Sequence, residues 1–236
     1  MHNPPQLIFY SPDISIAQIL PPAEAAHAIR VMRLGEGSEI LVADGKGAIY
    51  KACIERADPN NCRIAIIDRT DLPRHWMHDL HLAIAPTKNA DRMEWLCEKA
   101  AEVGINRISL LRCAHSERRE LRTDRLEKIL VSAMKQSGQA YLPALEPIAD
   151  FADFIRRPHP AQRFIAHCAP GSKAPLQSIC RPADALILIG PEGDFSPSEI
   201  ALATEEGFAP ISLGPSRLRT ETAGLVACII WHNAQG

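Results

Sequence analysis

The sequence predicts an α/β protein in which a small β-rich region, residues 1–70, precedes a larger domain, residues 71–236. Three short apolar segments around tight turns indicate strands in the first region, and such strands suggest a small β-barrel. From about residue 80 onward, apolar strands alternate with amphipathic helices. This alternation is typical of a mainly parallel sheet that helices cover on both faces.

The strands expected in the first region are Glu39–Ala43, Ala48–Ile54 and Cys62–Asp68. Asp44-Gly-Lys-Gly47 separates the first two strands, and its glycines can take the positive φ that a tight turn requires. A helix over Ala23–Met32 is expected before them. The polar, proline-containing segment Asp68–His75 marks the join to the second region.

The strands expected in the second region are Leu80–Ala85, Ile105–Leu111, Arg163–Cys168, Ala185–Ile189 and Pro210–Leu213. Asn89 is predicted to cap a helix that ends at Gly104, because Asn is favoured at the N-cap and Gly just beyond a helix end. Ser196-Pro-Ser-Glu199 combines an N-cap serine, a proline at the first helical position and a glutamate three residues after the cap. Further helices are predicted over Thr123–Ser137 and Glu221–Asn233.

The composition is that of an ordinary globular protein. The net charge of −2, from 26 basic and 28 acidic residues, argues against a protein that coats nucleic acid non-specifically. Seven scattered cysteines without CxxC spacing indicate neither a disulfide framework nor a zinc site, so no metal is expected. The N-terminal segment does not resemble a signal peptide, and no apolar run is long enough to span a bilayer. We therefore expect a cytoplasmic protein with reduced thiols and no membrane association.

Two polar segments directly follow predicted strands, namely Gly190–Phe195 and Gly214–Ala223. Ligands of parallel α/β sheets bind outside the carboxyl ends of the strands. The glycines of the first segment allow backbone amides to approach a ligand, although the same residues also occur in ordinary turns. The second segment exceeds the ~2–6 residues of a plain connection and contains two arginines, a glutamate and three hydroxyls. Together the two segments predict a ligand site.

Gly190-Pro-Glu-Gly-Asp-Phe195 and Leu213-Gly-Pro-Ser-Arg-Leu-Arg-Thr-Glu-Thr-Ala223 closely resemble the paired motifs of the bacterial 16S ribosomal RNA uracil-N3 methyltransferases. That family belongs to the trefoil-knotted SPOUT class of RNA methyltransferases, which depend on S-adenosyl-L-methionine (AdoMet). The resemblance extends to His27–Leu34, to Lys88 with Arg92–Ile105, to Gln136–Gly138 and to Leu142-Pro143, so that it covers almost the whole chain.

The resemblance implies a PUA-like, RNA-binding barrel and a C-terminal α/β domain with a deep trefoil knot. It further implies a homodimer with the site near the subunit interface, and the 16S rRNA of the small ribosomal subunit as partner. The residues that it assigns to AdoMet are Ile189, Gly190, Glu192, Gly193, Leu213, Gly214, Leu218 and Thr220. This chain departs from the family pattern at Gln139, His167, Asp194 and Ser216.

Methylation of uracil N3 requires that the imide proton leaves and that the resulting anion is stabilised. Arg219 is of the right type to stabilise this anion, and Glu221 could accept the proton or orient Arg219. Alternatively, Thr220 and Glu221 simply cap and charge the N-terminus of the last helix. The phosphate-contact candidates are Arg30, Arg33, Lys88 and Arg217, whereas Arg118 and Arg119 lie in a mixed-charge cluster that favours a solvated face.

Two other classes of protein remain open from the residues alone. One is a non-catalytic RNA-binding protein that keeps the methyltransferase fold. The other is a small-molecule enzyme that uses the glycine loop for phosphate, as helix N-termini often do. The second alternative lacks both a P-loop lysine and a dinucleotide fingerprint.

Overall fold

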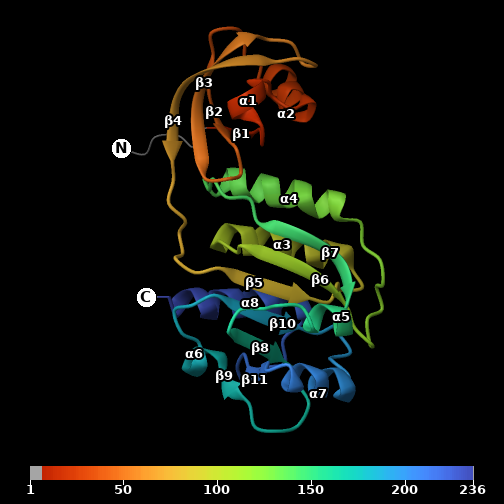
Figure 1. The fold of residues 1–236 in the computed structure, drawn as a ribbon. Coiled ribbons are helices and arrows are strands. Elements are labelled where there is room, and N and C mark those ends of the chain that lie inside the picture. Colours follow the sequence, from red (N-terminus) through yellow and green to blue (C-terminus); the bar gives the residue numbers. More distant parts are fainter. Residues whose placement is uncertain (1–6, 236) are drawn as a thin grey trace. The chain divides into compact units, whose positions relative to one another are not determined.

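The computed structural model describes residues 7–235, which divide into two compact units (Figure 1). Unit 1 comprises the described residues up to Arg74 together with Val131–Leu142. Unit 2 comprises His75–Leu130 and the chain from Pro143 onward. The division therefore differs from a single cut near residue 70, because the end of a later helix belongs to the first unit.

Unit 1 is built from β1 (Ile8–Tyr10), α1 (Ile14–Ala17), α2 (Pro22–Ala26), a π-helical turn (His27–Val31), β2 (Glu39–Ala43), β3 (Ala48–Arg56) and β4 (Arg63–Asp71). The strands form one sheet in the order β1-β2-β3-β4, in which β1 is parallel to β2 and the other pairs are antiparallel. The three predicted strands are confirmed. Among the described residues no pairing of β1 with β4 closes the sheet into a barrel.

The β2–β3 turn shows why Val131–Leu142 belongs to unit 1. Gly45 and Gly47 adopt φ values of 73° and 117°, as expected of this turn. The Leu142 N–H donates to the Gly45 carbonyl at 2.9 Å, and the Gly47 N–H donates to the Ala140 carbonyl at 3.0 Å. These backbone hydrogen bonds hold a segment that is remote in sequence against the turn.

Unit 2 contains a sheet of seven strands. These are β5 (Leu80–Ile84), β6 (Arg107–Arg112), β7 (Ala144–Asp150), β8 (Gln162–Ala166), β9 (Ala174–Pro175), β10 (Ala185–Ile189) and β11 (Ala209–Ser212). Their order is β7-β6-β5-β10-β8-β11-β9, and every pair is parallel. The predicted parallel α/β architecture is confirmed.

The helices of unit 2 are α3 (Ala90–Val103), α5 (Phe151–Ile155), α6 (Leu176–Ile179), α7 (Pro197–Glu205) and α8 (Thr220–Asn233), and α4 (Thr123–Gln136) continues into unit 1. Leu186 and Leu188 of β10 pack in a cluster with residues of α5 and α7. Gly224 of α8 lies against Leu82 and Ile84 of β5, where an added Cβ would meet Ile84 Cδ1 at 3.1 Å. Side chains on a strand alternate between faces, so helices cover both sides of the sheet (Figure 1).

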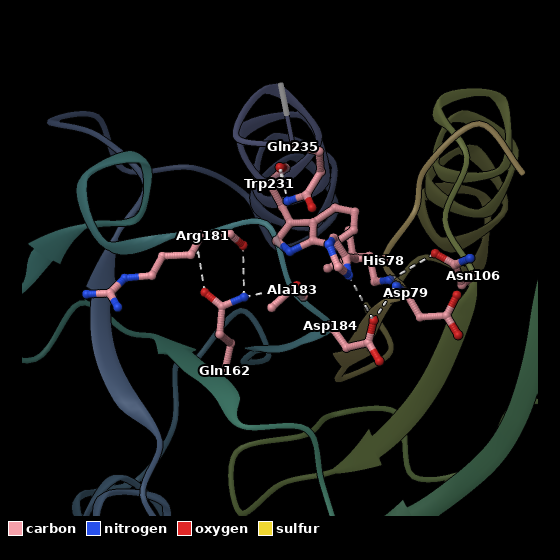
Figure 2. A network of polar contacts seen from close by, with 10 residues as sticks. His78, Asp79, Asn106, Gln162, Arg181, Ala183, Asp184, Trp231 and Gln235 are labelled. Atoms are coloured by element: carbon pink, nitrogen blue, oxygen red, sulfur yellow. Dashed lines mark hydrogen bonds and ion pairs between the residues drawn. The ribbon is translucent and has the colours of Figure 1, made fainter.

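The amino ends of the strands are held by a polar network (Figure 2). Asp184 Oδ1 accepts the Asp79 N–H at 2.8 Å, just before β10 and β5. The Gln162 side-chain amide donates to the Arg181 and Ala183 carbonyls, each at 2.9 Å. These contacts satisfy backbone groups at the amino ends of the strands. The carboxyl ends of the strands, where parallel α/β sheets bind ligands, lie on the opposite side of the sheet.

The predicted caps are present. The Asn89 side chain accepts the Asp91 N–H at 3.0 Å, and Gly104 ends α3 with a φ of 96°. Ser196 and Glu199 form the capping box at the start of α7. No helix among the described residues has both the length and the apolar character needed to cross a bilayer, and their His, Cys, Asp and Glu side chains form no cluster of three or more that could hold a metal.

Candidate active site

A cavity of about 340 Å³ lies at the carboxyl ends of β8, β10 and β11. The expected cofactor residues that line it are Ile189, Gly190, Glu192, Leu213, Gly214, Leu218 and Thr220. The structure therefore brings the two glycine-containing loops together around one hollow, although Gly190 and Gly214 lie 24 positions apart in the sequence.

The two loops are joined by a side-chain hydrogen bond. The Thr220 hydroxyl donates to the Gly190 carbonyl at 3.2 Å, and Thr220 is buried. The N-cap of α8 is Arg219, which makes no side-chain capping bond. Thr220 therefore does not cap the helix, contrary to the simpler interpretation of this residue, and instead ties α8 to the loop after β10.

Glu192 and Gly193 each contact a residue from another segment of unit 2. Glu192 Oε1 accepts the Lys88 N–H at 3.0 Å. Gly193 does not line the cavity, and a Cβ placed on it would meet the Cβ of His115 at 3.0 Å. The missing side chain of Gly193 thus leaves room for His115, and contact of Gly193 with the cofactor stays a prediction.

Asp194 supports the same loop with its backbone and its carboxylate. Its φ of 63° lies in the left-handed region, which Asp tolerates better than most residues do. The carboxylate accepts the Phe195 N–H at 2.8 Å and the Cys168 N–H at 2.7 Å. The departure from glycine at this position thus connects the loop after β10 to the end of β8.

The segment Ala166–Cys168, which follows β8, lines the cavity although its role was not predicted. Both ring nitrogens of His167 are buried without a hydrogen-bond partner among the described residues. Burial, reinforced by the charge of Lys173, holds the pKa of His167 below its usual value. We therefore expect a neutral ring at the cavity wall. Only the strand order β10-β8-β11 places this segment here.

Arg219 lines this cavity and also a second hollow of about 350 Å³ between the starts of α3 and α8. No hydrogen bond or ion pair joins its guanidinium to the described residues. Glu221 lines only the second hollow, where Oε1 lies 3.8 Å from Arg92 Nε. Glu221 is buried, and its Oε2 has no hydrogen-bond partner among the residues that the structure describes.

The predicted RNA-contact residues fall into three settings. Arg30 and Arg33 are exposed near the π-helical turn of unit 1, and Arg33 has a φ of 55°. Arg217 is exposed at the cavity in unit 2. Lys88 pairs with Glu117 at 2.8 Å. Arg118 donates to the Lys88 carbonyl at 2.7 Å, so its guanidinium supports that loop.

A parallel α/β domain with two glycine-containing loops around a strand-end cavity defines a small-ligand-binding domain of the doubly wound class. Comparison with known proteins identifies it further. Residues 74–232 match the family model of the RNA methyltransferase domain, and residues 20–67 match that of the RNA methyltransferase PUA domain. The chain therefore belongs to the RNA methyltransferase family, and the expected family is confirmed.

Individual relatives agree with this family. A crystal structure of a probable rRNA-methyltransferase from Porphyromonas gingivalis has 43% sequence identity and a TM-score of 0.91, and the match covers 97% of this chain and 98% of that one. Ribosomal RNA small subunit methyltransferase E from Neisseria gonorrhoeae, bound to S-adenosyl methionine, has 25% identity and a TM-score of 0.85 over 97% of both chains. Ribosomal RNA small subunit methyltransferase E from Bacillus subtilis is 26% identical over 218 residues, which is 86% of this chain and 85% of the relative.

Proposed function

We propose that this protein transfers a methyl group from AdoMet to N3 of a uracil in 16S ribosomal RNA. The observation that carries the proposal is the joined pair of loops. Gly190 and Thr220 are hydrogen-bonded across the cavity, and the unpaired guanidinium of Arg219 stands at its edge. The relatives that carry the name of a small-subunit rRNA methyltransferase support the RNA as substrate.

The cavity residues fit AdoMet in size and in chemistry. Its volume of about 340 Å³ falls within the ~300–1,000 Å³ of small-molecule sites. An added Cβ on Gly214 would meet no atom within 4 Å, and its φ of 131° lies in the region that favours glycine. The half-buried Leu213 and Leu218 offer apolar surface for the adenine ring. AdoMet supplies a methyl group that its sulfonium already activates.

The residues of the chain then have two tasks at the reacting base. Arg219 stabilises the negative charge that spreads over the uracil carbonyl oxygens when N3 loses its proton. Glu221 accepts that proton or orients Arg219. Arg30, Arg33, Lys88 and Arg217 contact phosphates, and the target base must be unpaired or extruded, because Watson–Crick pairing engages N3.

We further propose the family's PUA-like barrel in unit 1, a trefoil knot in unit 2, and a homodimer that acts in the cytoplasm. The homodimer is proposed from the resemblance of Gly190–Phe195 and Leu213–Ala223 to the motifs of that family. Sedimentation equilibrium tests the dimer: a mass near 26 kDa at micromolar concentration would contradict it.

The decisive experiment is transfer of radiolabelled methyl groups from AdoMet to small-subunit RNA, followed by identification of the modified base. 3-Methyluridine as the product is expected. Another methylated base would refute the uracil-N3 assignment but would still agree with a methyltransferase activity. AdoMet binding without any transfer would favour a non-catalytic RNA-binding protein, and calorimetry without AdoMet binding would refute the proposal as a whole.

A further inference from the structure

The second hollow, between the starts of α3 and α8, has the features of a binding site. It is lined by Asp91, Arg92, Trp95, Arg219, Glu221 and Thr222. Because Arg219 also lines the cofactor cavity, the two hollows adjoin at this side chain. A molecule in the second hollow would therefore lie beside a molecule in the first.

Glu221 lines this hollow, and one of its two carboxylate oxygens is buried without a hydrogen-bond partner among the described residues. Glu221 is 7% exposed, and its Oε2 is buried and accepts no hydrogen bond within the described part of the chain. The other oxygen, Oε1, lies 3.8 Å from Arg92 Nε, which is beyond hydrogen-bond distance. Burial of a carboxylate oxygen without a hydrogen-bond donor costs free energy. We therefore expect a ligand to supply a donor to this oxygen.

An exposed aromatic ring lies on the same hollow. Trp95 is 41% exposed, although it stands on α3 among buried side chains such as Leu96 and Cys97. Tryptophan offers a flat apolar face on which any nucleobase can stack. An exposed ring beside an N–H acceptor is the combination that a planar base with an imide N–H requires.

The charges of the hollow favour a neutral ligand. Its ionisable side chains are Asp91, Arg92, Arg219 and Glu221, two acidic and two basic. A phosphate group would need a net positive site. Balanced charge, one free acceptor and an aromatic face suit an uncharged base better than the phosphate backbone.

We propose that this second hollow holds the acceptor base of the RNA, with Trp95 stacked on its ring and Glu221 Oε2 accepting its N3–H. The proposal rests on the methyltransferase function and names the base-binding residues of that site. When N3 bonds to the methyl carbon, the bond from that carbon to sulfur breaks and its electron pair stays on sulfur. The N3 proton passes to Glu221, whose Oε1 lies 3.8 Å from Arg92 Nε.

The first test measures RNA binding without cofactor. A short oligouridylate is titrated into the whole protein while tryptophan emission is recorded, with wild type compared with Trp95→Phe. Quenching in wild type that is lost in Trp95→Phe is expected, because the other two tryptophans, Trp76 and Trp231, do not line the hollow. Equal quenching in both proteins would overturn the stacking role.

The second test measures kinetics on small-subunit RNA. Trp95→Ala is expected to raise KM for RNA about tenfold while the Kd for AdoMet stays unchanged, and Trp95→Phe is expected to restore most of the loss. Met77→Ala is the matched control, since Met77 is a 95% exposed apolar side chain of unit 2 that lines neither hollow. Unchanged KM in Trp95→Ala would overturn the proposal.

The third test separates the proposal from its alternatives. If Trp95→Ala dissociates a dimer in sedimentation while Trp95→Phe does not, Trp95 belongs to a subunit interface and the proposal fails.

Glu221→Gln is expected to lower kcat about a hundredfold with KM for RNA changed less than threefold, because the amide keeps the shape but cannot take the proton. Normal kcat in Glu221→Gln would remove the acceptor role. If wild type transfers no methyl group at all, the proposed function fails instead.

Discussion

The hydroxyl of Thr220 and the carbonyl of Gly190 are hydrogen-bonded at 3.2 Å in a buried position. The bond connects the first residue of α8 with the first residue after β10. Two chain segments separated by 30 residues therefore form one wall of the cavity. The position of each loop depends on that of the other.

Thr220→Val is expected to weaken AdoMet binding about tenfold. Valine keeps the shape of threonine but leaves the buried Gly190 carbonyl without its donor, and an unsatisfied buried group costs about 1–3 kcal/mol. Isothermal calorimetry measures the affinity. Thr220→Ser retains the hydroxyl and serves as the control, so equal losses in both variants would contradict the assignment of the effect to the hydrogen bond.

Arg219→Ala is expected to lower the rate of methyl transfer by at least about a hundredfold while AdoMet still binds. The guanidinium has no partner among the described residues, and its proposed role is to stabilise charge that develops only during the reaction. Single-turnover transfer and calorimetry measure the two properties. Near-normal turnover would remove Arg219 from the mechanism.

Gly193→Val is expected to weaken AdoMet binding by moving the loop, not by filling the cavity. The added Cβ would stand 3.0 Å from the Cβ of His115, so the backbone or His115 must shift. Gly35→Ala is the control, because a Cβ there meets no atom within 4 Å. Unchanged affinity and unchanged melting temperature in Gly193→Val would show that the loop adapts without cost.

Cys168 is expected to react with a maleimide faster than the buried thiols, and AdoMet is expected to slow that reaction. Cys168 is exposed and lines the cavity. Burial raises the pKa of Cys97 and of Cys228 to about 12, which keeps these thiols protonated and unreactive. Mass spectrometry of the labelled peptides identifies the site. Labelling that AdoMet does not affect would place the cofactor away from Cys168.

Unfolding free energy is expected to fall as the pH is lowered from about 6.5 to 4. Burial lowers the pKa of His81 to about 4, so the unfolded chain binds more protons in this window and stability rises with pH. The Ser109 hydroxyl donates to Glu146 at 2.5 Å, so it accepts from His81 Nε2 at 2.7 Å, which requires a proton on Nε2.

His81→Gln tests this assignment by urea unfolding across the same pH range. The amide can still donate to Ser109 but cannot titrate, so the slope is expected to decrease by up to about 1.4 kcal/mol per pH unit. Some slope is expected to remain, because burial also lowers the pKa of His232 to about 4. An unchanged slope would mean that His81 does not control acid stability.

Local patterns in the sequence determined the regular elements and their ends. Asn89, Gly104 and the Ser196 capping box mark helix ends through contacts within a few residues, so they were predictable. The strand β7 escaped prediction because it is an edge strand that contains Pro147 and charged residues, and edge strands need no alternating apolar pattern. The resemblance of two short motifs identified the cofactor loops.

The tertiary structure alone decided which distant residues meet. The strand order placed Ala166–Cys168 beside the cofactor loops, and no local pattern encodes that order. Packing of α3 against α8 put Trp95 and Arg92 beside Glu221. The loop that follows β6 placed His115 against Gly193. Helix and strand propensities act over a few residues, whereas a site is completed by contacts between residues that are far apart in the chain. The sequence by itself therefore determined the loops that form the cavity. Only the fold determined which residues from other segments contact those loops.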